Sequence, residues 1–200
     1  MRVGLLVILF LLWGSVQAVA MTPINADVIA QAQEYGKTRT DRSLTEFFQP
    51  WTVYEEKADK LDETGERAFV YTPFLLIAAD ARDKTLNSQT VRLSDAEQVL
   101  TEYNGYLIFG VIVFGNEADF AAKMVASLMQ GGKSVRPQSM YQPPEVEKAA
   151  WSSSQTPVSS ARWLLYFKMK DLAVDKPLVL QINQNGKPDR RFFFDLAGIR

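Results

Sequence analysis

The segment LVLQINQNGKPDRRFFFDL, from Leu178 to Leu196, has the pattern of two β-strands joined by a turn. Its Asn-Gly pair favours a two-residue type I′ turn, but that turn would place charged side chains among the aliphatic ones. A three-residue turn over 184–186, with Gly186 left-handed, gives one apolar face instead. Burying a large apolar side chain contributes about 1.5–3 kcal/mol, more than the ~1 kcal/mol span of strand propensities. We therefore predict a core hairpin whose buried face is formed by Leu178, Leu180, Ile182, Phe192, Phe194 and Leu196.

Three consecutive segments at the C-terminal end resemble the last strands of bacterial immunoglobulin-like sandwiches. They are RWLLYFKM (162–169), DKPLVLQI (175–182) and RRFFFDL (190–196). The resemblance implies an antiparallel sandwich and no particular activity. Trp163 is expected in the core because it lies in a strand pattern. Helical patterns earlier in the chain depart from a plain seven-stranded sandwich and favour an α+β class.

Three further segments predict strands. AFVYTPFLLIAA (68–79) is rich in strand-forming residues, and because Pro73 cannot donate to a ladder, we expect an edge strand or a bulge there. YLIFGVIVF (106–114) is apolar on both faces, which predicts a central strand, with Gly110 permitting a bulge. A third strand is expected over 133–141.

Two helices are predicted between these strands. The first spans Asp95 to Tyr103, with Ser94 and Glu97 as a capping box. The second is capped by Asn116 and ends at Gly131-Gly132, so that the GGKS motif (131–134) follows a helix and is not a phosphate-binding loop. The residues expected to face inward from this second helix are Phe120, Ala121, Met124, Val125, Leu128 and Met129.

The first twenty residues have the layout of a secretory signal peptide: Arg2, an apolar run over 3–13, and Ala18-Val19-Ala20. A membrane anchor is the alternative, but the run is shorter than the roughly 20 residues that span a bilayer. We predict cleavage after about Ala20, a secreted or periplasmic protein, and no stable membrane insertion afterwards. The chain has no cysteine, so no disulfide stabilises it, and a bacterial exporter fits best.

Residues 21–67 predict a helical N-terminal arm that precedes an α+β sandwich-like domain over 68–200. Asn25 can cap a helix over 26–36, and Ser43 with Glu46 forms a capping box for a short helix that Pro50 ends. The charged run over 55–67 is expected to be solvated. The apolar residues expected to dock this arm on the main body are Leu44, Phe47, Phe48 and Trp51.

The residue types that are absent narrow the chemistry. Without histidine or cysteine, the chain cannot form a Ser-His-Asp triad, a cysteine nucleophile or nearly any zinc site, and no serine has a lysine three residues later. A net charge of −1 gives no indication of a nucleic-acid partner. We predict a protein that is not an enzyme, with no cofactor and no metal. The acidic pairs that a glycosidase would need are Asp80 with Asp83, Glu145 with Glu147, and Glu55 with Glu56, all interpreted as solvated surface acids.

The segment over 142–161 has three prolines and little periodicity, which makes it the best candidate for a functional loop. Trp151 in this loop and Tyr141 just before it belong to no hydrophobic pattern, and the hairpin tip over 185–191 is free to meet a partner. The predicted partner-binding residues are Tyr141, Trp151, Asn185, Lys187 and Arg190. The leading hypothesis is an exported, non-catalytic binding or structural module that contacts a protein partner. The alternatives are a carboxylate-dependent glycan hydrolase and a carrier of a small ligand or lipid.

Overall fold

The computed structural model describes residues 24–117, 119–142, 146–149, 151–153, 158–184 and 186–199. The predicted signal segment and its cleavage position lie outside these residues. Within them the chain is an α+β protein, as predicted, and its strands form two antiparallel sheets. In this part of the chain no helix is long and apolar enough to cross a membrane.

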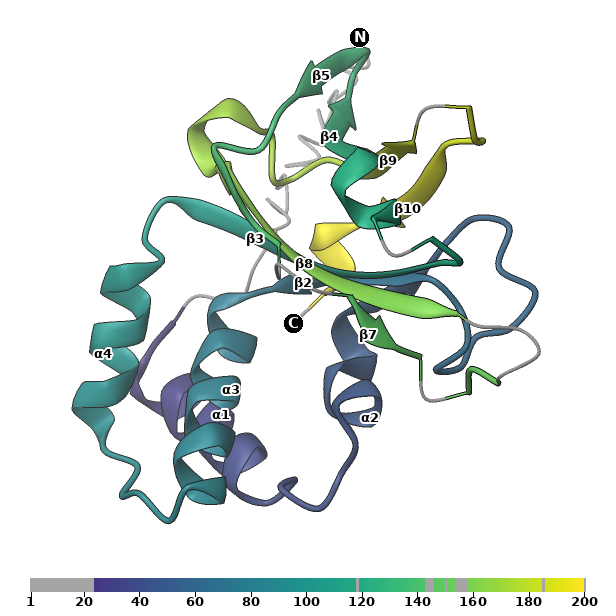
Figure 1. Cartoon of the computed structure of the whole chain (residues 1–200). Coiled ribbons are helices and arrows are strands. Elements are labelled where there is room, and N and C mark those ends of the chain that lie inside the picture. Colours follow the sequence, from purple (N-terminus) through teal and green to yellow (C-terminus); the bar gives the residue numbers. More distant parts are fainter. Residues whose placement is uncertain are drawn as a thin grey trace, which may run out of the picture.

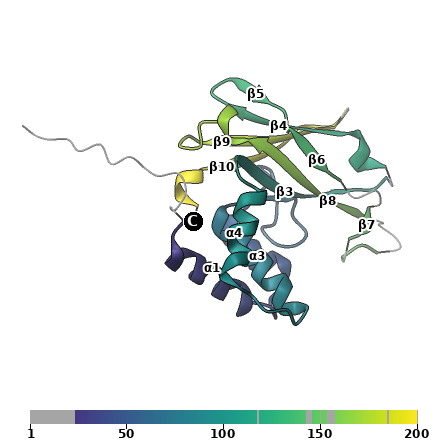
Figure 2. The same cartoon turned by 90° about the vertical axis from the view of Figure 1, so that its left-hand side faces the viewer.

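The structure has three layers: sheet B, sheet A and a layer of helices (Figure 1; Figure 2). Sheet A has the strand order β1-β2-β3-β8-β6, with β7 also paired to β8, and sheet B has the order β10-β9-β4-β5. The strands of sheet A are β1 (Thr52–Tyr54), β2 (Arg67–Tyr71), β3 (Tyr106–Gly115), β6 (Ser139–Tyr141), β7 (Glu147–Lys148) and β8 (Ser159–Lys168). Those of sheet B are β4 (Met124–Gln130), β5 (Lys133–Val135), β9 (Leu178–Gln184) and β10 (Arg190–Phe194).

The α-helices cover one face of sheet A. They are α1 (Ala26–Lys37), α2 (Leu44–Phe48), α3 (Pro73–Leu86) and α4 (Leu93–Glu102), and the short 3-10 helices are η1 (Gln49–Trp51), η2 (Phe120–Lys123), η3 (Met169–Asp171) and η4 (Leu196–Gly198). The predicted N-terminal helices and their caps are present: Asn25 accepts from Val28 N–H, and Ser43 with Glu46 forms the capping box. Phe47, Phe48 and Trp51 are buried as predicted, whereas Leu44 is exposed. The arm therefore shares one hydrophobic core with sheet A.

The hairpin β9–β10 has the predicted buried face. Phe192 pairs with Leu180, Phe194 pairs with Leu178, and Phe193 points outward with 51% of its surface exposed. The connection is longer than the predicted three residues, because pairing resumes only with Arg190 opposite Ile182. A longer turn preserves the face, since a shift of two residues returns each side chain to the same side of the sheet.

β3 is the central strand that its apolar sequence predicts, because it pairs with β2 on one side and β8 on the other. The bulge predicted at Gly110 is absent from this ladder, since pairing with β2 and with β8 continues through it without interruption. Gly110 instead leaves room for the ring of Phe69, which occupies the space where a Cβ atom would lie.

The strand predicted over 68–79 is wrong in its second half. β2 ends at Tyr71, Thr72 accepts from Leu75 N–H as an N-cap, and α3 begins at Pro73. Proline is favoured at the first helical position because its missing N–H has no partner there in any case. β2 is also not an edge strand, because β1 lies on its outer side.

The helix predicted after Asn116 is wrong. Only η2 is helical there, and β4 follows as a strand whose Met124, Ala126 and Leu128 are buried while Val125 is 56% exposed. Apolar residues at 124, 125, 128 and 129 fit both periodicities, and pairing with β9 decides between them. Gly131 and Gly132 form the tight turn to β5 with positive φ angles, so they do not end a helix.

Two smaller predictions are also corrected. The strand expected over 133–141 is two short strands, β5 and β6, that belong to different sheets. The predicted helix near 95–103 is present as α4, but it begins at Leu93, and Asp95 rather than Glu97 accepts the N-terminal hydrogen bond, from Arg92 N–H at 2.7 Å.

Candidate binding cleft

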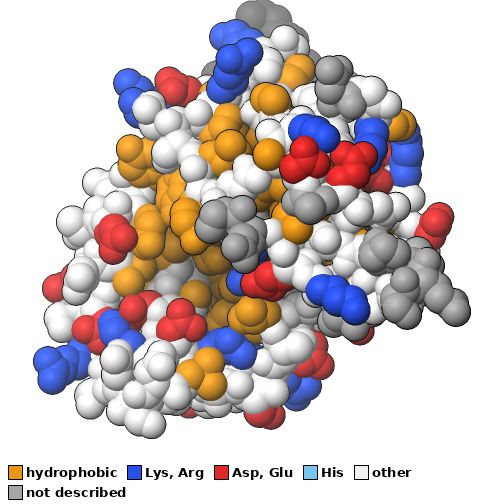
Figure 3. Space-filling model, viewed as in Figure 1, with side chains coloured by type: hydrophobic (Ala, Val, Ile, Leu, Met, Phe, Trp, Pro, Cys, Tyr) orange, Lys and Arg blue, Asp and Glu red, His pale blue; other side chains and the backbone are white. Residues whose placement is uncertain are grey.

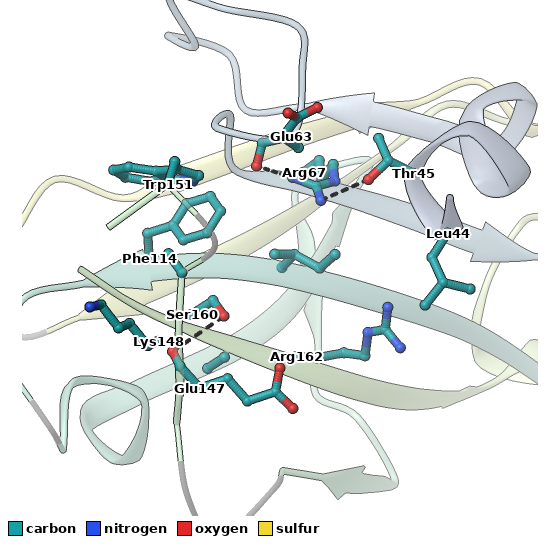
Figure 4. Close-up of a pocket in the computed structure, with 13 residues that line it drawn as sticks. Leu44, Thr45, Glu63, Arg67, Phe114, Glu147, Lys148, Trp151, Ser160 and Arg162 are labelled. Atoms are coloured by element: carbon teal, nitrogen blue, oxygen red, sulfur yellow. Dashed lines mark hydrogen bonds between the residues drawn. The ribbon is translucent and has the colours of Figure 1, made fainter. Parts of the chain in front are cut away.

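The helices leave part of sheet A uncovered between α4 and β7, where hydrophobic side chains are visible at the surface (Figure 3). A cleft of about 560 Å³ opens on the same face of sheet A, between α2 and β7. Its floor is made by β3 and β8, and its walls by α2, the segment before β2, β7 and the loop that follows β7. We refer to this feature as the cleft (Figure 4).

Two cross-strand pairs form the floor of the cleft. Ile112 pairs with Arg162, and Phe114 pairs with Ser160. Because paired residues project from the same face of a sheet, these four side chains point together toward the cleft. The intervening β8 residues Ala161 and Trp163 are buried, so this strand is apolar toward the core and mixed toward the cleft.

An aromatic pair forms one wall. The ring centroids of Trp151 and Phe114 are 5.3 Å apart with an interplanar angle of 70°, and Trp151 is 42% exposed. The loop carrying Trp151 is tied to the chain just before β8 by two hydrogen bonds: Ala149 N–H donates to Val158 O, and Val158 N–H donates to Ser152 Oγ. A large aromatic surface is therefore held at the rim of the cleft.

Arg67 is buried beside the floor with only 7% of its surface exposed. Its guanidinium donates to the backbone oxygens of Glu63 and Gly65 at 3.0 and 2.9 Å and to Thr45 Oγ1 at 3.2 Å. Among the described residues no carboxylate lies within ion-pair distance of it. Burial lowers the pKa of Arg67, and the positive charge of Arg162 lowers it further.

The other cations of the cleft have no partner either within the described part of the chain. Neither Arg162 nor Lys148 forms a side-chain ion pair there. The cleft also contains two acids, Glu63 and Glu147, which lie on opposite sides of it with their carboxylates directed away from each other (Figure 4). This arrangement differs from the facing carboxylates that glycoside hydrolysis uses.

A second, smaller pocket of about 250 Å³ lies farther along the same face of sheet A, against α3 and α4. Three tyrosines and three acids line it: Tyr71, Tyr103, Tyr166, Asp80, Asp83 and Glu102. Asp80 and Asp83 directly follow the segment over 68–79 that was predicted as a strand, and they lie on α3 instead. Lys84 forms ion pairs with Asp80 at 2.8 Å and with Asp95 at 3.3 Å. Burial raises the pKa of Tyr71 to about 12.

The predicted partner-binding residues have different surroundings. Trp151 lines the cleft, whereas Tyr141 is 58% exposed on β6, at the edge of sheet A and outside the cleft. Lys187 is exposed at the hairpin tip, and Asn185 lies outside the described residues. Arg190 is not a free contact residue, because its Nε lies 2.6 Å from Glu66 Oε2 in a mostly buried ion pair.

Sequence reasoning missed Arg67, Arg162 and Phe114 as components of one site. Arg67 is the last residue of the charged run that was interpreted as solvated. The sequence feature that could have identified it is its position directly before the apolar residues of a strand. Of the acidic pairs, Glu145 lies outside the described residues, and Glu147 is exposed at the cleft. Within the described ranges, no group of three or more acidic side chains could hold a metal ion.

No protein-family model matches this chain, and a search of curated proteins finds no match. The function must therefore be argued from the cleft itself.

Proposed function

We propose that this protein is an exported, non-catalytic binding module of the bacterial envelope or exterior, and that its cleft receives a segment of a partner protein. One observation carries the proposal: the partly exposed Trp151–Phe114 pair stands beside Arg67 and Arg162, neither of which has a carboxylate partner among the described residues. Tryptophan, tyrosine and arginine are the residue types that contribute most to protein interfaces.

The other parts of the proposal have support from the sequence. The N-terminal segment has the layout of an export signal, and the absence of histidine and cysteine removes the common catalytic side chains. The immunoglobulin-like resemblance of the segments that form β8, β9 and β10 also belongs to the proposal, as a resemblance of fold that names no activity.

Photo-crosslinking in the source cells tests the proposal. With p-benzoylphenylalanine in place of Lys148, at the cleft, we expect one discrete protein adduct, and Trp151→Ala should reduce its yield. The same probe in place of Lys133, in the β4–β5 hairpin on sheet B, is the positional control. Phe193→Ala removes an aromatic ring of similar exposure from sheet B and should leave the adduct unchanged. An adduct that forms equally well without Trp151, or no adduct at Lys148, would contradict the proposal.

A carboxylate-dependent glycan hydrolase is the second candidate, because Glu63 and Glu147 both line the cleft. It requires the two carboxylates to act on one bond, and therefore a rearrangement of the walls. Release of reducing ends from envelope glycans by the pure protein, abolished by Glu147→Gln, would establish this candidate in place of the first.

A further inference from the structure

The charge of Arg67 is unusual for its location. Its side chain is more than nine-tenths buried, yet its described hydrogen-bond acceptors are two backbone oxygens and one hydroxyl, all uncharged. A buried charge without a counter-ion costs free energy, and the nearby acids Asp62 and Glu63 compensate it only from a distance. An anion from outside the chain would remove this cost.

Arg162 stands in the same row of the sheet as Arg67. Both residues pair with Ile112 of β3, one from β2 and one from β8. Since neighbouring strands are about 4.8 Å apart, the two arginine Cα atoms are separated by about 10 Å across one face, within the combined reach of two long side chains. Two like charges so placed repel each other, and a carboxylate between them would satisfy both.

The next row of the same face is aromatic. Phe114 and Ser160 form it, two residues along each strand and therefore about 7 Å from the arginine row, with Trp151 packed on Phe114. A ligand that matches both rows carries a carboxylate next to an apolar or aromatic group. Ile112 lies between the two arginines, and most of the exposed surface of the cleft is apolar, which suits an apolar side chain beside a carboxylate better than the many hydroxyls of a sugar and favours a polypeptide.

We propose that Arg67 and Arg162 form a carboxylate subsite that takes an acidic side chain of the partner segment, next to an apolar residue of that segment that packs on Trp151 and Phe114. This inference rests on the proposed function and names the chemistry of the partner. Arg162 supplies an exposed, adaptable cation, and Arg67 supplies a fixed one.

Two dipeptide probes test the subsite: acetyl-Phe-Glu-amide and its uncharged counterpart acetyl-Phe-Gln-amide. Binding is followed by the NMR signal of the Trp151 indole N–H, assigned from Trp151→Phe. The acidic probe should bind more tightly than the neutral one, and Arg162→Gln should weaken the acidic probe at least about fivefold while leaving the neutral probe unchanged. Arg136→Gln is the matched control, because it removes one exposed cation that does not line the cleft.

Arg67 is tested with the conservative variant Arg67→Lys, which keeps the charge but loses the forked donor geometry. This variant should bind the acidic probe more weakly, and its NMR spectrum reports whether it is folded. If it unfolds, Arg162→Gln alone decides the question. A third probe, trigalacturonate, presents carboxylates on a glycan, and tighter binding of this probe through Arg162 would overturn the assignment to a polypeptide.

The possible failures can be told apart. If both dipeptides bind equally and Trp151→Ala abolishes both, the carboxylate subsite is wrong while the binding cleft stands. Equal binding of the acidic probe to the parent protein and to Arg162→Gln would also refute the subsite. If neither dipeptide perturbs Trp151, the subsite fails. The proposed function fails with it only if the crosslinking test also fails, through the absence of an adduct at Lys148 or an adduct that does not depend on Trp151.

Discussion

The Nε atom of Arg190 lies 2.6 Å from Glu66 Oε2, and this ion pair joins β10 of sheet B to the start of β2 in sheet A. The same two side chains hold the backbone of Phe114: its N–H donates to Glu66 Oε1 at 3.0 Å, and its carbonyl accepts from Arg190 Nη2 at 3.4 Å. The ion pair between the sheets therefore also fixes the residue on which Trp151 packs.

Replacing Glu66 should be costly. Glu66→Gln leaves the mostly buried Arg190 without its counter-charge, and we expect the free energy of unfolding to fall by about 2–4 kcal/mol in urea titrations. Glu56→Gln removes an exposed acid nearby and serves as the control. The double variant Glu66→Leu with Arg190→Met should lose less than Glu66→Gln. A loss below about 0.5 kcal/mol for Glu66→Gln would mean that the pair is no stronger than an ordinary surface ion pair.

The three consecutive phenylalanines should respond alternately to substitution. Phe192 and Phe194 are buried, and the ring of Phe194 lies 4.9 Å from that of Phe109 across the two sheets. Phe192→Ala should lower the free energy of unfolding by about 3–5 kcal/mol, whereas Phe193→Ala on the outer face should cost less than about 1 kcal/mol. Chemical denaturation of the two variants measures the difference. Similar losses of unfolding free energy would contradict the prediction that Phe192 and Phe193 lie on opposite faces of the sheet.

The stability of the protein should fall at high pH because the buried phenol of Tyr71 resists ionisation in the native state. Burial raises the pKa of this phenol from 10.0 to about 12, so the native state retains a proton that the unfolded state loses. Its contribution is complete below pH 10 and is lost as the pH rises from 10 through 12, an effect on the order of 2 kcal/mol. Denaturation at pH 9 and pH 11.5 should show a smaller decline for Tyr71→Phe than for the parent protein. Equal declines would assign the effect to other groups.

The packing of the Phe69 ring should depend on the absence of a side chain at Gly110. Gly110→Ala places a methyl group where the Phe69 ring lies, and we expect a destabilisation of about 1–3 kcal/mol. The added change Phe69→Leu should recover part of this loss. Gly198→Ala is the control, because an added Cβ there meets no atom within 4 Å. An unchanged thermal unfolding midpoint in Gly110→Ala would mean that the Phe69 ring can adopt another position without loss of stability.

The parts of the fold that depend on residues close together in the sequence were predicted correctly. The caps at Asn25 and Ser43, the two-faced apolar strand β3 and the alternating apolar face of the hairpin are all present. Segments whose residues fit two periodicities were predicted wrongly, as in the predicted helix that is β4. There the deciding interaction is pairing with β9, which lies about 50 residues later in the chain and leaves no mark in the local pattern.

The candidate site was predictable only in part. Trp151 was identified because no hydrophobic pattern explained it, and it lines the cleft. The cations beside it come from β2 and β8, and only the intervening β3 brings them into one row, so their relationship follows from strand order rather than from sequence. Arg190 was selected because it lies at the hairpin tip, but its partner Glu66 lies more than a hundred residues away in the chain.

Every second residue of β8 faces the cleft side of sheet A, and the residues between them complete the core between the two sheets. The surface of the sheet and the packing of the core are thus set by alternating residues of one ten-residue strand. If the cleft binds a partner as proposed, substitutions at Ser160 and Arg162 would change its specificity, while the buried residues beside them keep the core intact.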